Sequence, residues 1–389
     1  MRFRVFACLL FISLCGLLAC SNNNSVATTL GTGTLYIAAQ GDNSLRAYTV
    51  ALSNGSLTQL GAVLGTGSSP VAIAVSPALN ALFVDNTVSE TVSSYSVNSD
   101  GSLTAVAGTV KTGSMPKGMV IDPLGRFLFV ANQRSSNISM YSINSATLTE
   151  VAGSPFTTIP AGTTVATGPS AVAASASGNF LYVANTFTNT VSAYTISATG
   201  LTPLGTSPFA VGLAPSGLAV PPSGGFLYVA NTGTNNISAF SICDKIVTSC
   251  ANVNAPDGNL TPVVGSPFSD GGSPIAMAID PAFNFLYVLD SLSNQISSFA
   301  YGAGSGVLTP LSVSPTVSTG QAPASLVVVS GTTGVNIGNT LTNPTDFVYV
   351  VNNESSTLSV YSLNTTTGAL NTLGLAAQTA VNPTAVAAQ

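Results

Sequence analysis

Short apolar phrases separated by polar turns follow one another along the chain from about residue 34 to its end. The most regular phrase is Leu-Tyr-Val-Ala-Asn, which is complete at residues 181–185 and 227–231. Seven copies or close variants begin at Leu35, Leu82, Leu128, Leu181, Leu227, Leu286 and Val348. The differences between successive numbers are 47, 46, 53, 46, 59 and 62 residues. This period predicts seven copies of one structural unit, with insertions in the third, fifth and sixth.

Each unit contains four phrases with the composition of β-strands. The Leu-Tyr-Val-Ala-Asn phrase is followed by a Ser-x-Tyr phrase, as at residues 137–143, and by a Leu-Thr-Pro phrase, as at residues 260–268. The fourth phrase is a short apolar run after a proline, as at residues 274–279. Four short strands per unit predict an all-β protein, a seven-bladed β-propeller with four antiparallel strands per blade over residues 34–389. A parallel β-solenoid, the alternative, needs shorter rungs.

The four phrases also indicate their order within a blade. The proline-led run is rich in Ala, Gly and Val, which suits the crowded innermost strand, A; the next two phrases become strands B and C. The Leu-Thr-Pro phrase becomes the outer strand D, because a free sheet edge tolerates proline. The repeats begin with a B phrase at residues 34–38 and end with an A phrase at residues 383–388. We therefore expect the C-terminal strand to complete the N-terminal blade and close the ring.

The N-terminal segment has the pattern of a secretory signal. Arg2 and Arg4 precede an apolar run from Val5 to Leu18. A charged start followed by a short apolar run is typical of a signal peptide, which we place at residues 1–19.

The end of that segment, Leu17-Leu18-Ala19-Cys20, resembles a bacterial lipobox. We predict a lipid on Cys20 as the protein's only membrane contact, and a flexible lipid-anchored tether over residues 20–33. Ordinary secretion with cleavage near Ala19 is the alternative. Either route exports the protein to the bacterial cell envelope, in the periplasm or at the outer membrane or cell surface.

Composition excludes several function classes. Charged residues make up 5% of the chain, against about 25% in an average protein, and there is no histidine. A net charge of −5 leaves no basic surface for phosphates, so we expect no nucleic-acid partner. Imidazole-based metal sites and histidine general bases are impossible. We expect no metal, no cofactor and a monomer.

The Tyr-Val-Ala-Asn phrase, together with Leu-Thr-Pro and Gly-Ser-Pro-Phe, resembles the seven-bladed propellers of the lactonase and YVTN-repeat family over residues 34–389. The resemblance implies relatives of three kinds: hydrolases of phosphogluconolactone, cycloisomerases of muconate lactones, and envelope proteins without assigned chemistry. It also implies a catalytic cluster of His, Arg and Glu at one end of the channel. This chain has no histidine, so that cluster does not carry over.

Two sets of residues are candidates for a site where the B–C and D–A connections meet. The first set, a binding mouth, consists of the polar residues that end the B phrases: Asn86, Asn132, Asn185, Asn231, Asp290 and Asn352. The alternative role of these residues is to cap turns.

The second set consists of scarce charges. Lys117 and Arg134 are candidates to orient a carboxylate or polarise a lactone carbonyl, and Asp85 or Glu90 is a candidate base that activates water. Their alternative role is that of solvated loop charges.

Cys243 and Cys250 lie in the insertion of the fifth unit. In an exported protein this pair predicts a disulfide that closes a local loop.

The sequence leads us to expect a binding or interaction module of the cell envelope, with a glycan, a peptide, an envelope protein or a small lactone as ligand. The alternative is a lactonase-like hydrolase, of the 6-phosphogluconolactonase or cycloisomerase type, with its site at the channel mouth.

Overall fold

A computed structural model describes residues 32–247, 250, 256–280, 284–330, 346–376 and 380–389. The predicted signal peptide, Cys20 and residues 20–31 of the predicted tether lie outside these residues. The described residues form β-strands and one short 3-10 helix, η1 (Pro77–Leu79). No helix in this part of the chain is long and apolar enough to span a bilayer.

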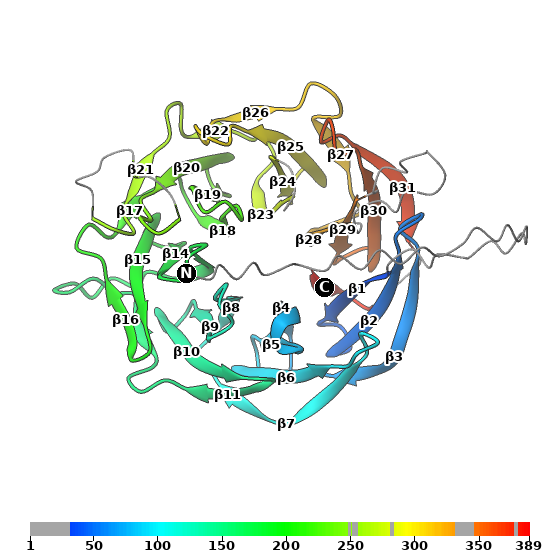
Figure 1. Cartoon of the computed structure of the whole chain (residues 1–389), viewed down its shortest axis with the longest axis horizontal. Helices are drawn as coiled ribbons and strands as arrows, with labels where there is room; N and C mark the ends of the chain where they lie inside the picture. Colours follow the sequence, from blue (N-terminus) through cyan, green and yellow to red (C-terminus); the bar gives the residue numbers. More distant parts are fainter. Residues whose placement is uncertain (1–31, 248–249, 251–255, 281–283, 331–345, 377–379) are drawn as a thin grey trace, which may run out of the picture. The chain divides into compact units, whose positions relative to one another are not determined.

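The strands that begin at the proline of each unit form the inner wall of a ring (Figure 1). Around this ring β32 contacts β4, and each inner strand contacts the next until β28 contacts β32 again. Seven blades therefore close on themselves, as predicted. The seven A strands are β4 (Pro70–Ser76), β8 (Pro116–Ile121), β13 (Pro169–Ala174), β18 (Pro215–Ala219), β23 (Pro274–Ile279), β28 (Pro323–Val329) and β32 (Pro383–Ala388).

The B strands are the most deeply buried elements. In β14, for example, all six residues are buried, because each face packs against a neighbouring blade. The B strands are β1 (Thr32–Ala39), β5 (Ala81–Asn86), β9 (Phe127–Asn132), β14 (Phe180–Asn185), β19 (Phe226–Asn231), β24 (Phe285–Asp290) and β29 (Asp346–Asn352).

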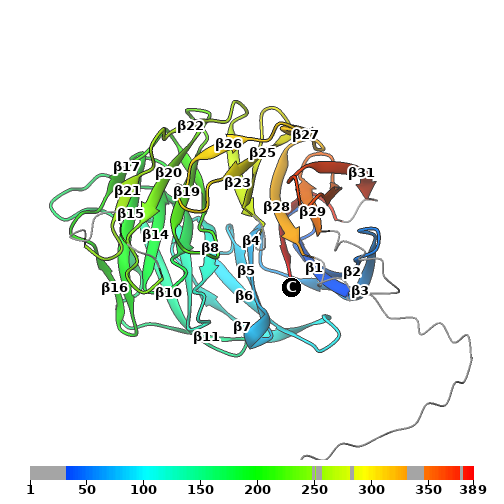
Figure 2. The same ribbon diagram turned by 45° about the horizontal axis from the view of Figure 1, so that its top comes forward.

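The C strands pair antiparallel with the B strands and carry the D strands on their outer side. In the tilted view of Figure 2, outer strands such as β7 and β11 lie on the perimeter and inner strands such as β4 and β8 lie toward the centre. The C strands are β2 (Ser44–Ala51), β6 (Thr91–Val97), β10 (Asn137–Asn144), β15 (Thr190–Ser197), β20 (Asn236–Ile242), β25 (Gln295–Tyr301) and β30 (Thr357–Leu363).

The D strands are continuous in three blades and broken into two pieces in four. The continuous ones are β3 (Leu57–Gly65), β7 (Leu103–Lys111) and β31 (Leu370–Ala376). The broken ones are β11 (Thr147–Glu150) with β12 (Phe156–Thr157), β16 (Gly200–Pro203) with β17 (Phe209–Ala210), β21 (Leu260–Pro262) with β22 (Phe268–Ser269), and β26 (Leu308–Pro310) with β27 (Thr316–Ser318). At the first three breaks a serine hydroxyl accepts a hydrogen bond from a strand-C backbone N–H that lacks a backbone partner, as in Met140 N–H to Ser154 Oγ at 3.0 Å.

The blades are numbered from the one that contains both ends of the propeller. Blade 1 is β32 with β1–β3, blade 2 is β4–β7, blade 3 is β8–β12, blade 4 is β13–β17, blade 5 is β18–β22, blade 6 is β23–β27 and blade 7 is β28–β31.

The ring closes through blade 1, where the two ends of the propeller share one sheet. Strand β32 pairs antiparallel with β1, from Leu35 opposite Ala388 to Ala39 opposite Pro383. Beyond the last pair, Thr34 and Gln389 exchange backbone hydrogen bonds of 3.0 and 2.9 Å. The predicted closure of the ring is confirmed.

Tyrosines of the B strands join successive blades. In five blades a buried tyrosine hydroxyl donates to the backbone carbonyl of a glycine in the C–D turn of the next blade; we call these contacts the tyrosine latches. They are Tyr36 to Gly101, Tyr182 to Gly258, Tyr228 to Gly306, Tyr287 to Gly368 and Tyr349 to Gly55, at 2.8–3.1 Å. Blades 2 and 3 carry Phe83 and Phe129 at this position, without a hydroxyl.

The turn glycine of a latch is required by its surroundings. Gly55 has a φ of +72°, which favours glycine, and a Cβ there would lie 2.7 Å from the Phe347 ring of the neighbouring blade. The latch from Tyr349 therefore depends on a close approach that only glycine permits.

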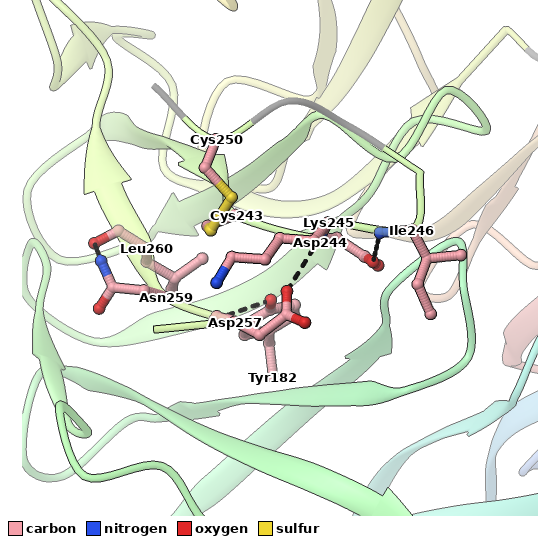
Figure 3. Close-up of a disulfide and its surroundings, with 10 residues drawn as sticks. Tyr182, Cys243, Asp244, Lys245, Ile246, Cys250, Asp257, Asn259 and Leu260 are labelled. Atoms are coloured by element: carbon pink, nitrogen blue, oxygen red, sulfur yellow. Dashed lines mark hydrogen bonds between the residues drawn. A yellow bond between two sulfur atoms is a disulfide. The ribbon is translucent and has the colours of Figure 1, made fainter. Parts of the chain in front are cut away.

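The predicted disulfide between Cys243 and Cys250 is present (Figure 3). It follows strand β20, and the adjoining Lys245 N–H donates to Asp257 Oδ1 at 3.0 Å, which also ties down this turn. The bridge joins residues seven positions apart.

We expect the double variant Cys243→Ser, Cys250→Ser to lose about 2 kcal/mol of unfolding free energy, because a loop this short constrains the unfolded chain only modestly. Urea unfolding of the oxidised protein and the variant measures the difference. Equal midpoints and slopes would contradict a stabilising role for the bridge.

Candidate functional site

One end of the channel combines the starts of the A strands with the B–C turns. A pocket of about 360 Å³ opens there on the side of blades 3 to 6. We call it the mouth pocket. It is lined by Lys117, Gln133, Ser170, Thr186, Ala214, Ser216, Thr232 and Ile275.

The hydroxyls of the mouth pocket are oriented by the wall behind them. Ser170 Oγ and Thr186 Oγ1 both donate to the carbonyl oxygen of Pro215, at 2.9 and 2.8 Å. In the next blade, Thr232 Oγ1 donates to Pro274 O at 2.7 Å. Because each hydroxyl has only one proton, these oxygens offer acceptors to a ligand. Blades 4 and 5 therefore form an acceptor side of the pocket.

The opposite side of the pocket belongs to blade 3 and offers donors. Lys117 is exposed on β8, and Gln133 is half-buried just after β9. Lys117 is the single charged residue among the described lining residues. A ligand that carries a carbonyl on one side and a hydroxyl or N–H on the other fits this division.

Asp85 lies buried at the boundary of blades 2 and 3. Its side chain is 0% exposed, at a position occupied by Ala131, Ala184 and Ala230 in the next three blades. Neither carboxylate oxygen makes a hydrogen bond of normal geometry. Burial raises the pKa of Asp85 well above its ordinary value, and the charge of Lys117 partly opposes this. The structure therefore places two of the four predicted catalytic residues, Asp85 and Lys117, within electrostatic range of each other.

The other two predicted catalytic residues lie outside the mouth pocket. Glu90 and Arg134 are exposed on the B–C turns of blades 2 and 3. Ser114 Oγ donates to Glu90 Oε1 at 2.6 Å, and the backbone N–H of Arg134 donates to Ser114 O at 3.1 Å. Glu90 through its side chain and Arg134 through its backbone therefore contact the connection that precedes β8, and both residues lie on the rim.

The asparagines predicted as a binding mouth are 0% exposed and turn into their own blades. In each, Nδ2 donates to a serine hydroxyl on strand C, at 2.8–3.0 Å. The pairs are Asn86 with Ser93, Asn132 with Ser139, Asn185 with Ser192, Asn231 with Ser238 and Asn352 with Ser359. These contacts hold the B–C turns.

Asp290 takes the asparagine position in blade 6 and is 1% exposed. Ser297 Oγ donates to its Oδ2 at 2.6 Å. Burial, together with the neighbouring Asp270 carboxyl, raises the pKa of Asp290 well above its ordinary value. The raised pKa favours the neutral form of Asp290, which resembles the neutral asparagines of the other blades.

The lining residues that sequence reasoning missed stand next to those it chose. Gln133, Thr186 and Thr232 each follow one of the buried asparagines, and Ser170 and Ser216 each follow the first proline of an A strand. Each of these positions is fixed by the repeat, directly after the last asparagine of a B strand or the first proline of an A strand. That place in the repeat is the signal that identifies them. Within the described residues, no group of three or more His, Cys, Asp or Glu side chains is arranged to hold a metal ion.

Solved structures with the same fold include the periplasmic gluconolactonase PpgL of Pseudomonas aeruginosa, with 18% identity and a TM-score of 0.71, covering 92% of this chain and 99% of that one. A proposed 6-phosphogluconolactonase of Bacteroides fragilis has 16% identity and a TM-score of 0.70, covering 94% and 100%. A Lactobacillus plantarum protein has 18% identity and a TM-score of 0.70, covering 92% and 100%. These likenesses establish the fold.

No curated protein matches the sequence. The family model "Lactonase, 7-bladed beta-propeller" matches residues 12–114, 71–154 and 152–246, which together span more than half of the chain. With seven blades, four-stranded sheets and this match, the chain belongs to the lactonase family of seven-bladed β-propellers.

Proposed function

We propose that this protein binds a lactone in the mouth pocket and hydrolyses its ring ester. The observation that carries the proposal is the single cation of the pocket, Lys117, whose charge acts on the buried Asp85. Membership of the lactonase family supports it, as do structural neighbours described as a gluconolactonase and a proposed 6-phosphogluconolactonase.

The two sides of the mouth pocket suit the groups of a lactone. The ring carbonyl oxygen faces the donors Lys117 and Gln133, and donor substituents of the ring face the oxygens of Ser170, Thr186 and Thr232. Water adds to the carbonyl carbon, and Lys117 stabilises the negative charge that develops on the carbonyl oxygen. The bond from that carbon to the ring oxygen breaks, and the ring oxygen takes the proton that water gives up. The product is a hydroxy acid.

Asp85 does not line the mouth pocket, so we assign it the role of a positioning residue that acts through Lys117. When Asp85 is ionised, its negative charge attracts the ammonium group of Lys117 and favours a position of Lys117 at this wall. The buried carboxyl lowers stability at neutral pH: since its folded pKa is raised, the stability it contributes is present in acid and lost as pH rises through that pKa. The next three blades have alanine at this position, so Asp85 costs stability that an alanine would not. Such a residue is expected where function requires it.

The test measures hydrolysis of δ-gluconolactone and of simple γ-lactones by the purified protein. We expect Lys117→Ala to lower kcat/KM about 100-fold or more, because it removes the charge that stabilises the transition state. Asp85→Ala should lower kcat yet raise the melting temperature at pH 7. Glu150→Gln, which changes an exposed carboxylate on the outer strand β11, is the matched control and should change neither. Full turnover in Lys117→Ala would refute the mechanism.

A second candidate function is ligand binding without turnover. No carboxylate lines the mouth pocket among the described residues, and Asp85 is 0% exposed. Those observations favour a binding module for a glycan, a peptide, an envelope protein or a lactone. Binding that Lys117→Ala abolishes, with no hydrolysis of any lactone by the unaltered protein, would select this function.

We further propose that the protein works in the bacterial cell envelope. The signal-like residues 1–19 and the lipobox-like residues ending at Cys20 support export and lipid anchoring. The disulfide between Cys243 and Cys250 is consistent with an oxidising compartment.

A further inference from the structure

A second hollow of the propeller lies along the inner strands. It has a volume of about 330 Å³, and we call it the channel cavity. The side chains that line it are all apolar; the largest are Val120, Val172, Leu218, Val220, Met277 and Ile279. Such a lining offers hydrocarbon contact and no side-chain hydrogen bond.

The channel cavity and the mouth pocket share the same four strands, β8, β13, β18 and β23. On β13, Ser170 lines the mouth pocket and Val172 lines the channel cavity; on β18, Ser216 and Leu218 do the same. The two residues of each pair are two positions apart in one strand, and a strand rises about 3.3 Å per residue. The polar and apolar linings are thus about 7 Å apart along one wall of the channel.

This division bears on the substrate. A sugar lactone carries hydroxyls around its ring and needs polar partners on every side, whereas polar groups without partners are costly to bury. The side chains that donate or accept hydrogen bonds lie at the mouth, and past them the side chains of the wall are apolar. A ligand that matches both parts is polar at one end and apolar at the other.

We propose that the substrate class is a lactone bearing an apolar alkyl chain, with its ring in the mouth pocket and its chain in the channel cavity. This inference rests on the proposed function for the ring, but the chain makes its own contacts. Each methylene seated against the cavity wall should tighten binding about fourfold, the equivalent of about 0.8 kcal/mol.

Binding and turnover are measured separately. Pyrrolidinones with methyl, butyl and octyl chains at carbon 5 keep the ring carbonyl but resist hydrolysis, so isothermal titration calorimetry with them reports binding. The γ-lactones with the same chains report turnover. We expect the dissociation constant to fall steeply from methyl to octyl, and the heat capacity change to become more negative as apolar surface is buried.

Met277 provides the matched variants. Met277→Gln keeps the length of the side chain but puts an amide against the alkyl chain, so the increase in affinity from the methyl to the octyl compound should shrink at least tenfold. Met277→Leu keeps an apolar wall and should preserve that increase in affinity. Melting temperatures confirm that both variants fold.

The outcomes separate the inference from the proposed function. Equal affinity for all three chains, with turnover of the methyl lactone, would overturn the alkyl inference and leave lactone hydrolysis standing. A steep dependence on chain length without turnover would support the alkyl site and refute hydrolysis. A steep dependence that persists in Met277→Gln would place the chain elsewhere and overturn the inference.

Discussion

Deletion of residues 383–389 is expected to abolish cooperative folding of the propeller. The deletion removes β32, the inner strand of blade 1, so β1 loses its antiparallel partner along Leu35–Ala39. It also removes the buried residues Ala385 and Val386 from two hydrophobic clusters and uncovers the neighbouring inner strands β4 and β28. An unpaired strand edge next to exposed apolar surface favours aggregation. Differential scanning calorimetry should show no sharp transition.

A point variant in the same strand separates ring closure from local contacts. Thr384→Ala leaves β32 in place and removes the hydrogen bond from Thr384 Oγ1 to Pro70 O of blade 2, at 2.6 Å, together with its longer contact to Ala38 O, at 3.4 Å. We expect it to lose about 1 kcal/mol and keep a single transition. A synthetic peptide of residues 380–389 should restore part of the transition of the deleted chain. Unchanged melting of the deletion variant would reject closure as a source of stability.

Alkaline unfolding is the second large effect that we expect. All eleven tyrosines are buried, and burial raises the pKa of each, to about 12 for Tyr36, Tyr95 and Tyr194. Unfolded tyrosines ionise near pH 10, at about their ordinary pKa. Above pH 10 the folded state holds more protons than the unfolded state. The contribution of the tyrosines to stability is therefore fully present below pH 10 and falls as pH rises toward the folded pKa values.

The expected loss is steep. Each buried phenol contributes up to about 1.4 kcal/mol of lost stability per pH unit, so several acting together exhaust the roughly 5–15 kcal/mol of a typical domain within about two units. Circular dichroism and tyrosinate absorbance, followed together from pH 8 upward, should change at the same pH. Ionisation of most tyrosines with native circular dichroism retained would contradict this coupling.

Tyr349→Phe is the control for the alkaline experiment. It removes the latch across the closure of the ring, from blade 7 to Gly55 of blade 1. At neutral pH it should destabilise the protein by about 1–3 kcal/mol, because the Gly55 carbonyl loses its donor. Above pH 10 its stability should fall less steeply, by up to about 1.4 kcal/mol per pH unit, because one ionising group is gone.

The repeat made most of the fold predictable. Each Leu-Tyr-Val-Ala-Asn copy lies on a B strand, and each proline-led phrase lies on an A strand. The C-terminal phrase at residues 383–388 pairs with β1 as expected, and the two cysteines form the expected disulfide. These features depend on local composition and on the order of phrases along the chain. The breaks in four D strands were not predicted; at three of them a serine side chain replaces the missing backbone partner.

The site was less accessible to sequence reasoning. Asn132 marks the end of a B strand, but whether it faces the channel or the blade depends on how that strand packs against its neighbours. Its amide finds Ser139 inside the blade, and Gln133 reaches the mouth pocket instead. Asp85 and Lys117 are 32 positions apart in the chain, and only the contact between blades 2 and 3 brings their charges into range.

By itself, the sequence determined the seven repeats, the strand order, the closure of the ring and the absence of histidine chemistry, because each follows from residue types and their spacing. The tertiary structure alone decided which polar residues face the channel, that Asp85 is buried within electrostatic range of Lys117, and that a polar mouth pocket and an apolar channel cavity share four inner strands. These properties arise between blades, where side chains from distant parts of the chain share one wall, and no single repeat contains them.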